Sequence, residues 1–188
     1  MALNTVERDP REAPPEVTPM AGGQAGNISL QPTYLSTMPL GFEGAPATMV
    51  GWDADTYSYD PTAGATILPF GRAVSLKGTT AGTTERQCAL GGATNFRGVA
   101  LRDITQNPKP VGVSDGYAAG WSVGVLWRGD IFIRAKGAVT PASAVAYDPA
   151  TGEFGSNAAC TVAVPNAQYK RGAANAEIAI LRLFGPQA

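Results

Sequence analysis

Glycine and proline break this chain at such regular intervals that a long helix has little room to form. There are 23 Gly and 15 Pro among 188 residues, and no helical pattern of about 12 residues or more survives between them. About nine short runs with apolar residues at strand-like spacing lie between the breaks. The spacing predicts an all-β fold, a single antiparallel β-barrel or β-sandwich domain.

The strongest strand pattern lies in residues 121–154. Apolar side chains alternate with small or polar ones from Trp121 to Trp127, and the alternation resumes from Ile131 to Lys136. The intervening Gly129-Asp130 fits a type II′ turn, so the sequence predicts a β-hairpin. A third strand near residues 144–147 and a turn at 148–152 extend the hairpin into an antiparallel meander.

Weaker patterns predict the other strands. These are expected at residues 49–52, 56–59, 70–76, 88–90, 95–104, 160–164 and 177–184. Asp53-Ala54-Asp55 is interpreted as a turn between the first two, and Gly91-Gly92 as the connection of a strand pair. Gly98 predicts a bulge. Residues 165–174 are expected to be a loop, and the nearly continuous apolar run at 177–184 predicts burial on both faces.

The N-terminal residues have a different composition. Residues 1–33 contain several prolines and charges but no Phe, Trp or Tyr, so they cannot bury enough apolar surface to offset the entropy of ordering. Large apolar residues then follow without helix or strand period. We expect residues 1–44 to form an extended N-terminal arm, with a disordered terminus as the alternative, and residues 45–188 to form the β domain. The candidates for contact with a partner or a neighbouring subunit are Tyr34, Leu35, Met38, Leu40 and Phe42.

Charge and hydropathy exclude several partners. The formal net charge is −1, which gives no electrostatic footprint for nucleic acid or an anionic membrane. No apolar run approaches the roughly 20 residues of a membrane span, and the charged start of the chain lacks the apolar core of a signal peptide. We therefore expect an intracellular protein with a protein partner, in which Cys88 and Cys160 are not joined by a disulfide.

Two short strings in the predicted hairpin match functional motifs. Residues 120–124, GWSVG, fit the nucleophile elbow around Ser122, but that chemistry needs a histidine base and the chain has no histidine. Arg128-Gly129-Asp130 spells an integrin-binding tripeptide, which the turn geometry explains by itself. We predict that neither string is functional.

Other chemistry has little support in the sequence. Asp53 and Asp55 are interpreted as solvated turn acids, because a calcium site needs six to eight oxygen ligands. No phosphate-binding glycine loop is present. Three tryptophans, with Tyr117 and Tyr147, could line a sugar-binding face, although aromatic residues that alternate on strands are more often core. We expect a non-enzymatic protein without catalytic residues, cofactor or metal.

The order of features from residue 34 to 184 resembles that of the structural cement (head decoration) proteins of tailed bacteriophages. The segments that carry the resemblance are Tyr34–Gly44, Phe70–Val74, Leu90–Val99, Ala100–Thr105, Lys136–Val139, Asn166–Tyr169 and Leu181–Leu183. It implies a protein that binds the outer surface of an assembled head and joins neighbouring major capsid protein subunits.

The resemblance also implies a location and an assembly. The protein would be made in the host cytoplasm and would end on the outside of the virion, as a homo-oligomer for which a trimer is expected first and a dimer second. The alternative from the sequence is a receptor- or carbohydrate-binding β module of the virion surface.

Overall fold

The computed structural model of this chain describes residues 40–48, 51–61, 66–77, 86–103, 115–156 and 158–185, all of which belong to one compact unit that begins at Pro39. Within these ranges the regular structure is entirely β, which confirms the prediction of an all-β fold. The strands are β1 (Asp53–Tyr59), β2 (Ile67–Pro69), β3 (Ala73–Leu76), β4 (Gln87–Leu90), β5 (Phe96–Ala100), β6 (Gly116–Ala118), β7 (Ser122–Lys136), β8 (Ala146–Tyr147), β9 (Phe154–Gly155), β10 (Val162–Ala163), β11 (Ala167–Arg171) and β12 (Ile178–Phe184).

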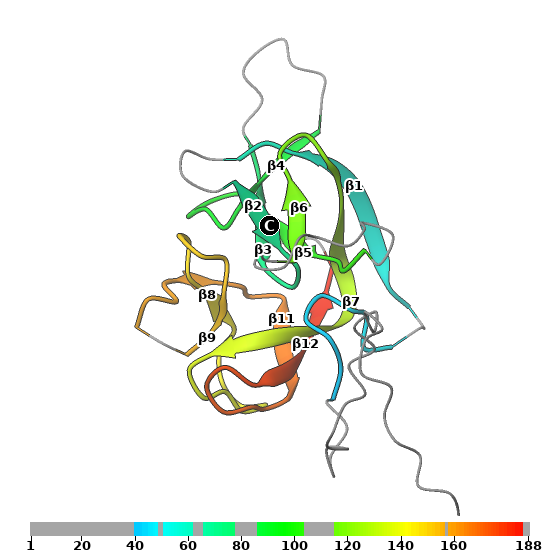
Figure 1. Cartoon of the computed structure of the whole chain (residues 1–188). Coiled ribbons are helices and arrows are strands. Elements are labelled where there is room, and N and C mark those ends of the chain that lie inside the picture. The colour runs from blue at the N-terminus through cyan, green and yellow to red at the C-terminus, as the bar shows by residue number, and fades with distance from the viewer. Residues whose placement is uncertain are drawn as a thin grey trace, which may run out of the picture. The chain divides into compact units, whose positions relative to one another are not determined.

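Five strands close into a barrel-like ring (Figure 1). β1 pairs with β4 and β7, β3 lies between β4 and β5, and β5 pairs with β7. The ring and the short β2–β6 sheet share a hydrophobic cluster that includes Tyr59, Leu68, Val74, Tyr117 and Val125. The prediction of a purely antiparallel fold is wrong in two places, because β1 pairs with β4 and β7 with β9 in parallel. Each parallel partner returns only after other strands have intervened, as a parallel crossover requires.

A second cluster lies under the other half of β7. β12 pairs with the residues of β7 from Arg128 to Arg134, and β11 pairs with β12. Ala179, Leu181 and Leu183 of β12 are buried while the residues between them are only partly buried. The predicted burial of this strand on both faces is therefore wrong. The predicted loop at 165–174 contains β11, in which Tyr169 alone is buried, so no apolar alternation marked it as a strand.

The predicted β-hairpin at Gly129-Asp130 is absent, because β7 continues through both residues for 15 residues. Its first half belongs to the barrel, and its second half carries Ile131 and Ile133 into the second cluster. Gly129 has φ +126°, and a Cβ there would lie 2.6 Å from Cβ of Trp52. Glycine is thus required by a close approach inside a strand and not by a turn.

Four smaller predictions can be compared with the structure. Asp53–Asp55 is not a turn but the start of β1, paired with β7. β4 and β5 do not pair around Gly91-Gly92, since β3 separates them. The register of β3 with β5 slips between Val74 and Ser75, opposite Phe96–Gly98, which confirms the predicted bulge. The turn at 148–152 is also confirmed, closed by the Gly152 amide, which donates to the Asp148 carbonyl at 2.8 Å.

Candidate functional site

Residues 40–48, here called the clip segment, lie along one edge of β7 (Figure 1). The Gly44 amide donates to the backbone carbonyl of Phe132 at 2.8 Å, and the Phe132 amide donates to the carbonyl of Ala45 at 3.0 Å. The Ala47 amide donates to the backbone carbonyl of Asp130 at 2.8 Å. These bonds satisfy the edge of β7 that faces away from β12. The clip segment is therefore part of the folded unit.

The clip segment approaches the barrel closely at Gly44. This residue has φ +81°, a left-handed conformation that favours glycine, and a Cβ there would lie 2.7 Å from Cβ of Phe70. Its carbonyl accepts a hydrogen bond from the Arg102 amide at 2.7 Å. The position of the segment is consequently fixed from two sides, by β7 and by the residues after β5.

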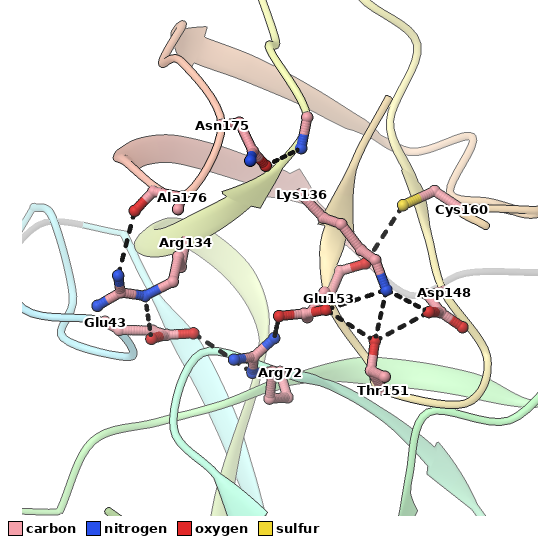
Figure 2. A network of polar contacts seen from close by, with 11 residues as sticks. Glu43, Arg72, Arg134, Lys136, Asp148, Thr151, Glu153, Cys160, Asn175 and Ala176 are labelled. Atoms are coloured by element: carbon pink, nitrogen blue, oxygen red, sulfur yellow. Dashed lines mark hydrogen bonds and ion pairs between the residues drawn. The ribbon is translucent and has the colours of Figure 1, made fainter. Parts of the chain in front are cut away.

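Glu43 connects the clip segment to a chain of ion pairs of alternating sign (Figure 2). Its carboxylate lies 3.2 Å from Nε of Arg134 and 3.4 Å from Nε of Arg72, and Arg72 reaches Glu153 at 2.6 Å. Glu153 in turn lies 3.1 Å from Nζ of Lys136. Burial lowers the pKa of Arg72 from its usual value, although Glu43 opposes that shift. A guanidinium stays charged even so.

The chain of ion pairs ends in the turn at 148–152. Lys136 donates to Asp148 at 2.6 Å, and the Thr151 hydroxyl donates to the same carboxylate at 3.0 Å. Burial by itself would raise the pKa of Asp148, but the hydrogen bonds from Lys136, the Ala150 amide and Thr151 outweigh it, and the pKa is lowered. With three cations and three anions from Arg134 to Asp148, the network neutralises itself and serves to hold the clip segment and the turn in place.

An open hollow of about 810 Å³ lies beside the clip segment. Its charged lining consists of Arg72, Arg102, Arg134, Glu43 and Asp115. The guanidinium carbon of Arg102 lies 5.5 Å from the ring centre of Phe42 and 5.1 Å from that of Phe70, so both rings make cation–π contacts with it. The hollow thus combines aromatic surface with an ordered positive charge.

Two of the five predicted contact residues lie in the clip segment. Phe42 is 64% exposed and Leu40 is 36% exposed, while Tyr34, Leu35 and Met38 lie outside the described residues. The structure brings Phe42 onto Arg102 at the rim of the hollow.

The arginines that surround the predicted contact residues could not be recognised from the sequence. Arg72, Arg102 and Arg134 come from three distant parts of the chain, and no local pattern joins them to the clip segment. The one local signal was Glu43, a lone acidic residue in an otherwise apolar segment.

The Arg-Gly-Asp string has a structural role that the sequence did not predict. The Asp130 side chain is only 2% exposed and accepts hydrogen bonds from Nε and Nη2 of Arg182 on β12, at 2.6 and 2.8 Å. Those bonds, more than the opposing effect of burial, lower the pKa of the Asp130 carboxyl. A buried and paired carboxylate is not presented to a receptor.

The remaining motifs also lie on strands. Ser122 begins β7, as predicted from the sequence, and the chain continues from it as a strand and not as a helix. Asp53 and Asp55 do not lie in a turn but on β1, where they pair with Arg128 and Arg97, and the Asp53 side chain is 46% exposed. Among the described residues, no group of three or more His, Cys, Asp or Glu side chains is placed to hold a metal ion.

The aromatic residues considered for a sugar-binding face do not form one surface. Tyr117 and Tyr147 are buried. Trp52 and Trp121 are partly exposed, but the strand pairs next to them, Asp53 with Arg128 and Ser58 with Ser122, are five residues apart along β1, or roughly 17 Å at the rise of a strand.

Two other features of the described part of the chain bear on its class. No disulfide joins Cys88 and Cys160, and burial raises the pKa of Cys88 to about 12. No helix in these residues is long and apolar enough to cross a membrane.

The chain is similar to known proteins in sequence and in fold. Residues 30–184 match the family described as structural cement protein (E217 gp24/Pam3 gp6). A solved chain from the capsid of Myoviridae phage XM1 aligns with a TM-score of 0.58 and 17% sequence identity, covering 88% of this chain and 98% of that chain. At this identity the likeness shows a shared fold. No match is found among curated protein sequences.

Proposed function

The chain belongs to the phage structural cement protein family, and from this premise we propose that it binds the outer surface of a capsid and joins neighbouring major capsid protein subunits. Membership of the family makes it a structural protein of the virion and not a member of an enzyme class. The finer proposal concerns which surface makes the contact and what the contact achieves.

The exposure of Phe42 carries the proposal. A phenylalanine that is 64% exposed leaves most of its apolar ring in water, and a partner that covers the ring removes this surface from water. Here the backbone around it is fixed by hydrogen bonds to β7, and its ring is held against Arg102. An aromatic residue held rigidly at the surface costs little further entropy on binding, which is typical of the residues that dominate protein interfaces.

We further propose that residues 1–44 form an extended arm, whose residues 40–44 also belong to the clip segment, and that the arm and the clip segment act together on the capsid. The contact candidates Tyr34, Leu35 and Met38 directly precede the clip segment in the sequence, and we propose that they contact the same partner. We propose a homo-oligomer, a trimer first and a dimer second. One such oligomer would bridge several major capsid protein subunits, because its later contacts form at high effective concentration once the first is made.

The test compares two exposed phenylalanines. We expect Phe42→Ala to reduce binding to heads purified without this protein by about tenfold or more, as loss of an interface hot spot does. Because neither side chain belongs to a core, both Phe42→Ala and the matched control Phe184→Ala should change the free energy of unfolding by less than about 0.5 kcal/mol. Binding is measured by sedimentation of the protein together with the heads. Stabilisation of the heads is measured by the temperature at which they release DNA.

The control gives the outcome that would overturn the proposal. Phe184 is 56% exposed at the end of β12, outside the clip segment. If Phe184→Ala weakens head binding as much as Phe42→Ala does, or if the wild-type protein does not bind heads, the assignment of the capsid contact to the clip segment is wrong.

A further inference from the structure

Resting on the proposed function, we infer that the hollow beside the clip segment receives an acidic extended segment of the capsid partner. Its carboxylates pair with Arg102 and Arg134, and an apolar side chain next to them packs on Phe42. The inference names the chemistry of the partner, which the proposed function leaves open.

The charges of the hollow favour an anionic partner. Three arginines line it against two carboxylates, Glu43 and Asp115. Arg72 is only 14% exposed and is committed to Glu43 and Glu153. The guanidinium groups of the other two arginines remain accessible, with side chains 28% and 49% exposed for Arg102 and Arg134, so a partner carboxylate can reach them.

The accessible arginines have weak or incomplete pairing among the described residues. Arg102 donates to Asp115 at 3.0 Å, but the Asp115 side chain is 63% exposed, and an ion pair in water contributes little. Arg134 is 49% exposed and uses Nε on Glu43 and Nη1 on the Ala176 carbonyl. Each guanidinium has five N–H groups, so both retain donors for a partner carboxylate.

The setting of Arg102 makes it suited to a carboxylate. The rings of Phe42 and Phe70 both make cation–π contacts with its guanidinium, and these contacts favour one position of the group. The N–H edge of a guanidinium held in this way matches the two oxygens of a carboxylate. A partner that supplies a carboxylate would therefore replace the exposed Asp115.

The size and mixed lining of the hollow point to a protein segment. A volume of about 810 Å³ is far larger than a single carboxylate needs, and Phe42, Pro69, Phe70 and Ile178 supply apolar wall. Glu43 and Asp115 on the same lining would repel the continuous row of phosphates of a nucleic acid, whereas a protein segment can place single carboxylates at the arginines and an apolar side chain on the rings. An acidic segment with an apolar side chain satisfies both parts of the lining.

The test identifies what lies in the hollow on assembled particles. Full-length protein carrying the photoreactive residue benzoylphenylalanine in place of Phe42 is bound to heads purified without the protein, irradiated and digested. We expect mass spectrometry to find a cross-linked capsid peptide with at least two Asp or Glu within about four residues of the cross-link, the reach of the hollow. A cross-link to a neutral or basic segment, or to another copy of this chain, would overturn the inference.

Charge variants provide an independent readout in the same binding assay. Arg102→Gln and Arg134→Gln should each weaken head binding about fivefold, and the loss should shrink at high salt. Arg102→Lys keeps the charge but not the planar N–H edge, so it should lie between. Arg171→Gln, an exposed arginine on β11, is the matched control and should bind as the wild type does. Thermal unfolding of each variant separates loss of binding from loss of fold.

The outcomes separate this inference from the proposed function. If wild-type protein binds heads but the Gln variants at 102 and 134 bind equally well, or if Arg171→Gln weakens binding as much as they do, the hollow is not the recognition site although the capsid role stands. If the wild-type protein does not bind heads, the proposed function fails and the inference fails with it.

Discussion

An acidic side chain on β7, Asp130, and another beside β7, Glu43, are both paired with arginine, yet they stabilise different parts of the molecule. Asp130 is 2% exposed, and its partner Arg182 is on β12, a strand that backbone hydrogen bonds already join to β7. Glu43 is 17% exposed, and its partners Arg72 and Arg134 hold a segment outside the named strands that carries the exposed Phe42. The first pair strengthens the fold, whereas the second holds in place the segment that carries the proposed contact residue Phe42. The two roles differ in how deeply the carboxylate is buried and in which part of the chain it holds, and not in the type of residue.

The largest expected effect comes from crowding the clip segment at its tightest point. Gly44→Ala should lower the free energy of unfolding by about 3 kcal/mol, because left-handed backbone costs about 1 kcal/mol and a Cβ 2.7 Å from Phe70 adds the cost of overpacking, about 2 kcal/mol. Gly51→Ala is the matched control, since Gly51 has a similar φ of +72° but nothing within 4 Å of the added Cβ. Urea unfolding measures both, and equal losses would show that the clip segment is not packed as described.

The next effect separates the two acidic residues. Asp130→Asn should destabilise the fold by about 2 kcal/mol, the scale of lost charged hydrogen bonds at a buried group, with head binding unchanged once the variant is folded. Glu43→Gln should cost about 1 kcal/mol or less but weaken head binding more than Asp130→Asn does. If the two variants change stability and binding in the same proportion, the distinction between fold and contact surface fails.

The smallest effect is the response to acid. Hydrogen bonds from Arg182 hold the pKa of Asp130 below its usual value of about 3.9. The stability that this carboxylate contributes is therefore fully present above about pH 4 and is lost as the pH falls through the lowered pKa of the folded state. Asp130→Asn should reduce the loss of stability between pH 5 and pH 2, as measured by urea unfolding at each pH. An unchanged slope would show that the ion pair does not contribute.

The sequence predicted the class of fold and two exposed apolar residues of the clip segment for identifiable reasons. The close spacing of glycine and proline leaves no room for long helices, and this is a local property of the sequence. Leu40 and Phe42 were recognisable because they are large apolar residues in a segment without helix or strand periodicity. The arginines were not predictable. Arg134 is 91 positions from Glu43, and only the register of the clip segment on β7 brings the two together.

The wrong prediction of a turn at Gly129-Asp130 also arises because the deciding contacts are distant in the sequence. Glycine followed by aspartate is typical of a turn, but it also fits a strand in which the glycine backbone is crowded and the carboxylate is paired. The deciding contacts are Trp52 against Gly129 and Arg182 with Asp130, and both come from distant parts of the chain. Local sequence contains neither.

The most direct test of the central claim is the orientation of this protein on a decorated head, determined by electron cryo-microscopy of heads incubated with the full-length chain. We predict that the clip segment and its hollow face the major capsid protein, with capsid density within contact distance of Phe42 and Arg102. The contrary result would be a map in which the clip segment faces solvent and the capsid instead contacts Trp52 and Phe184.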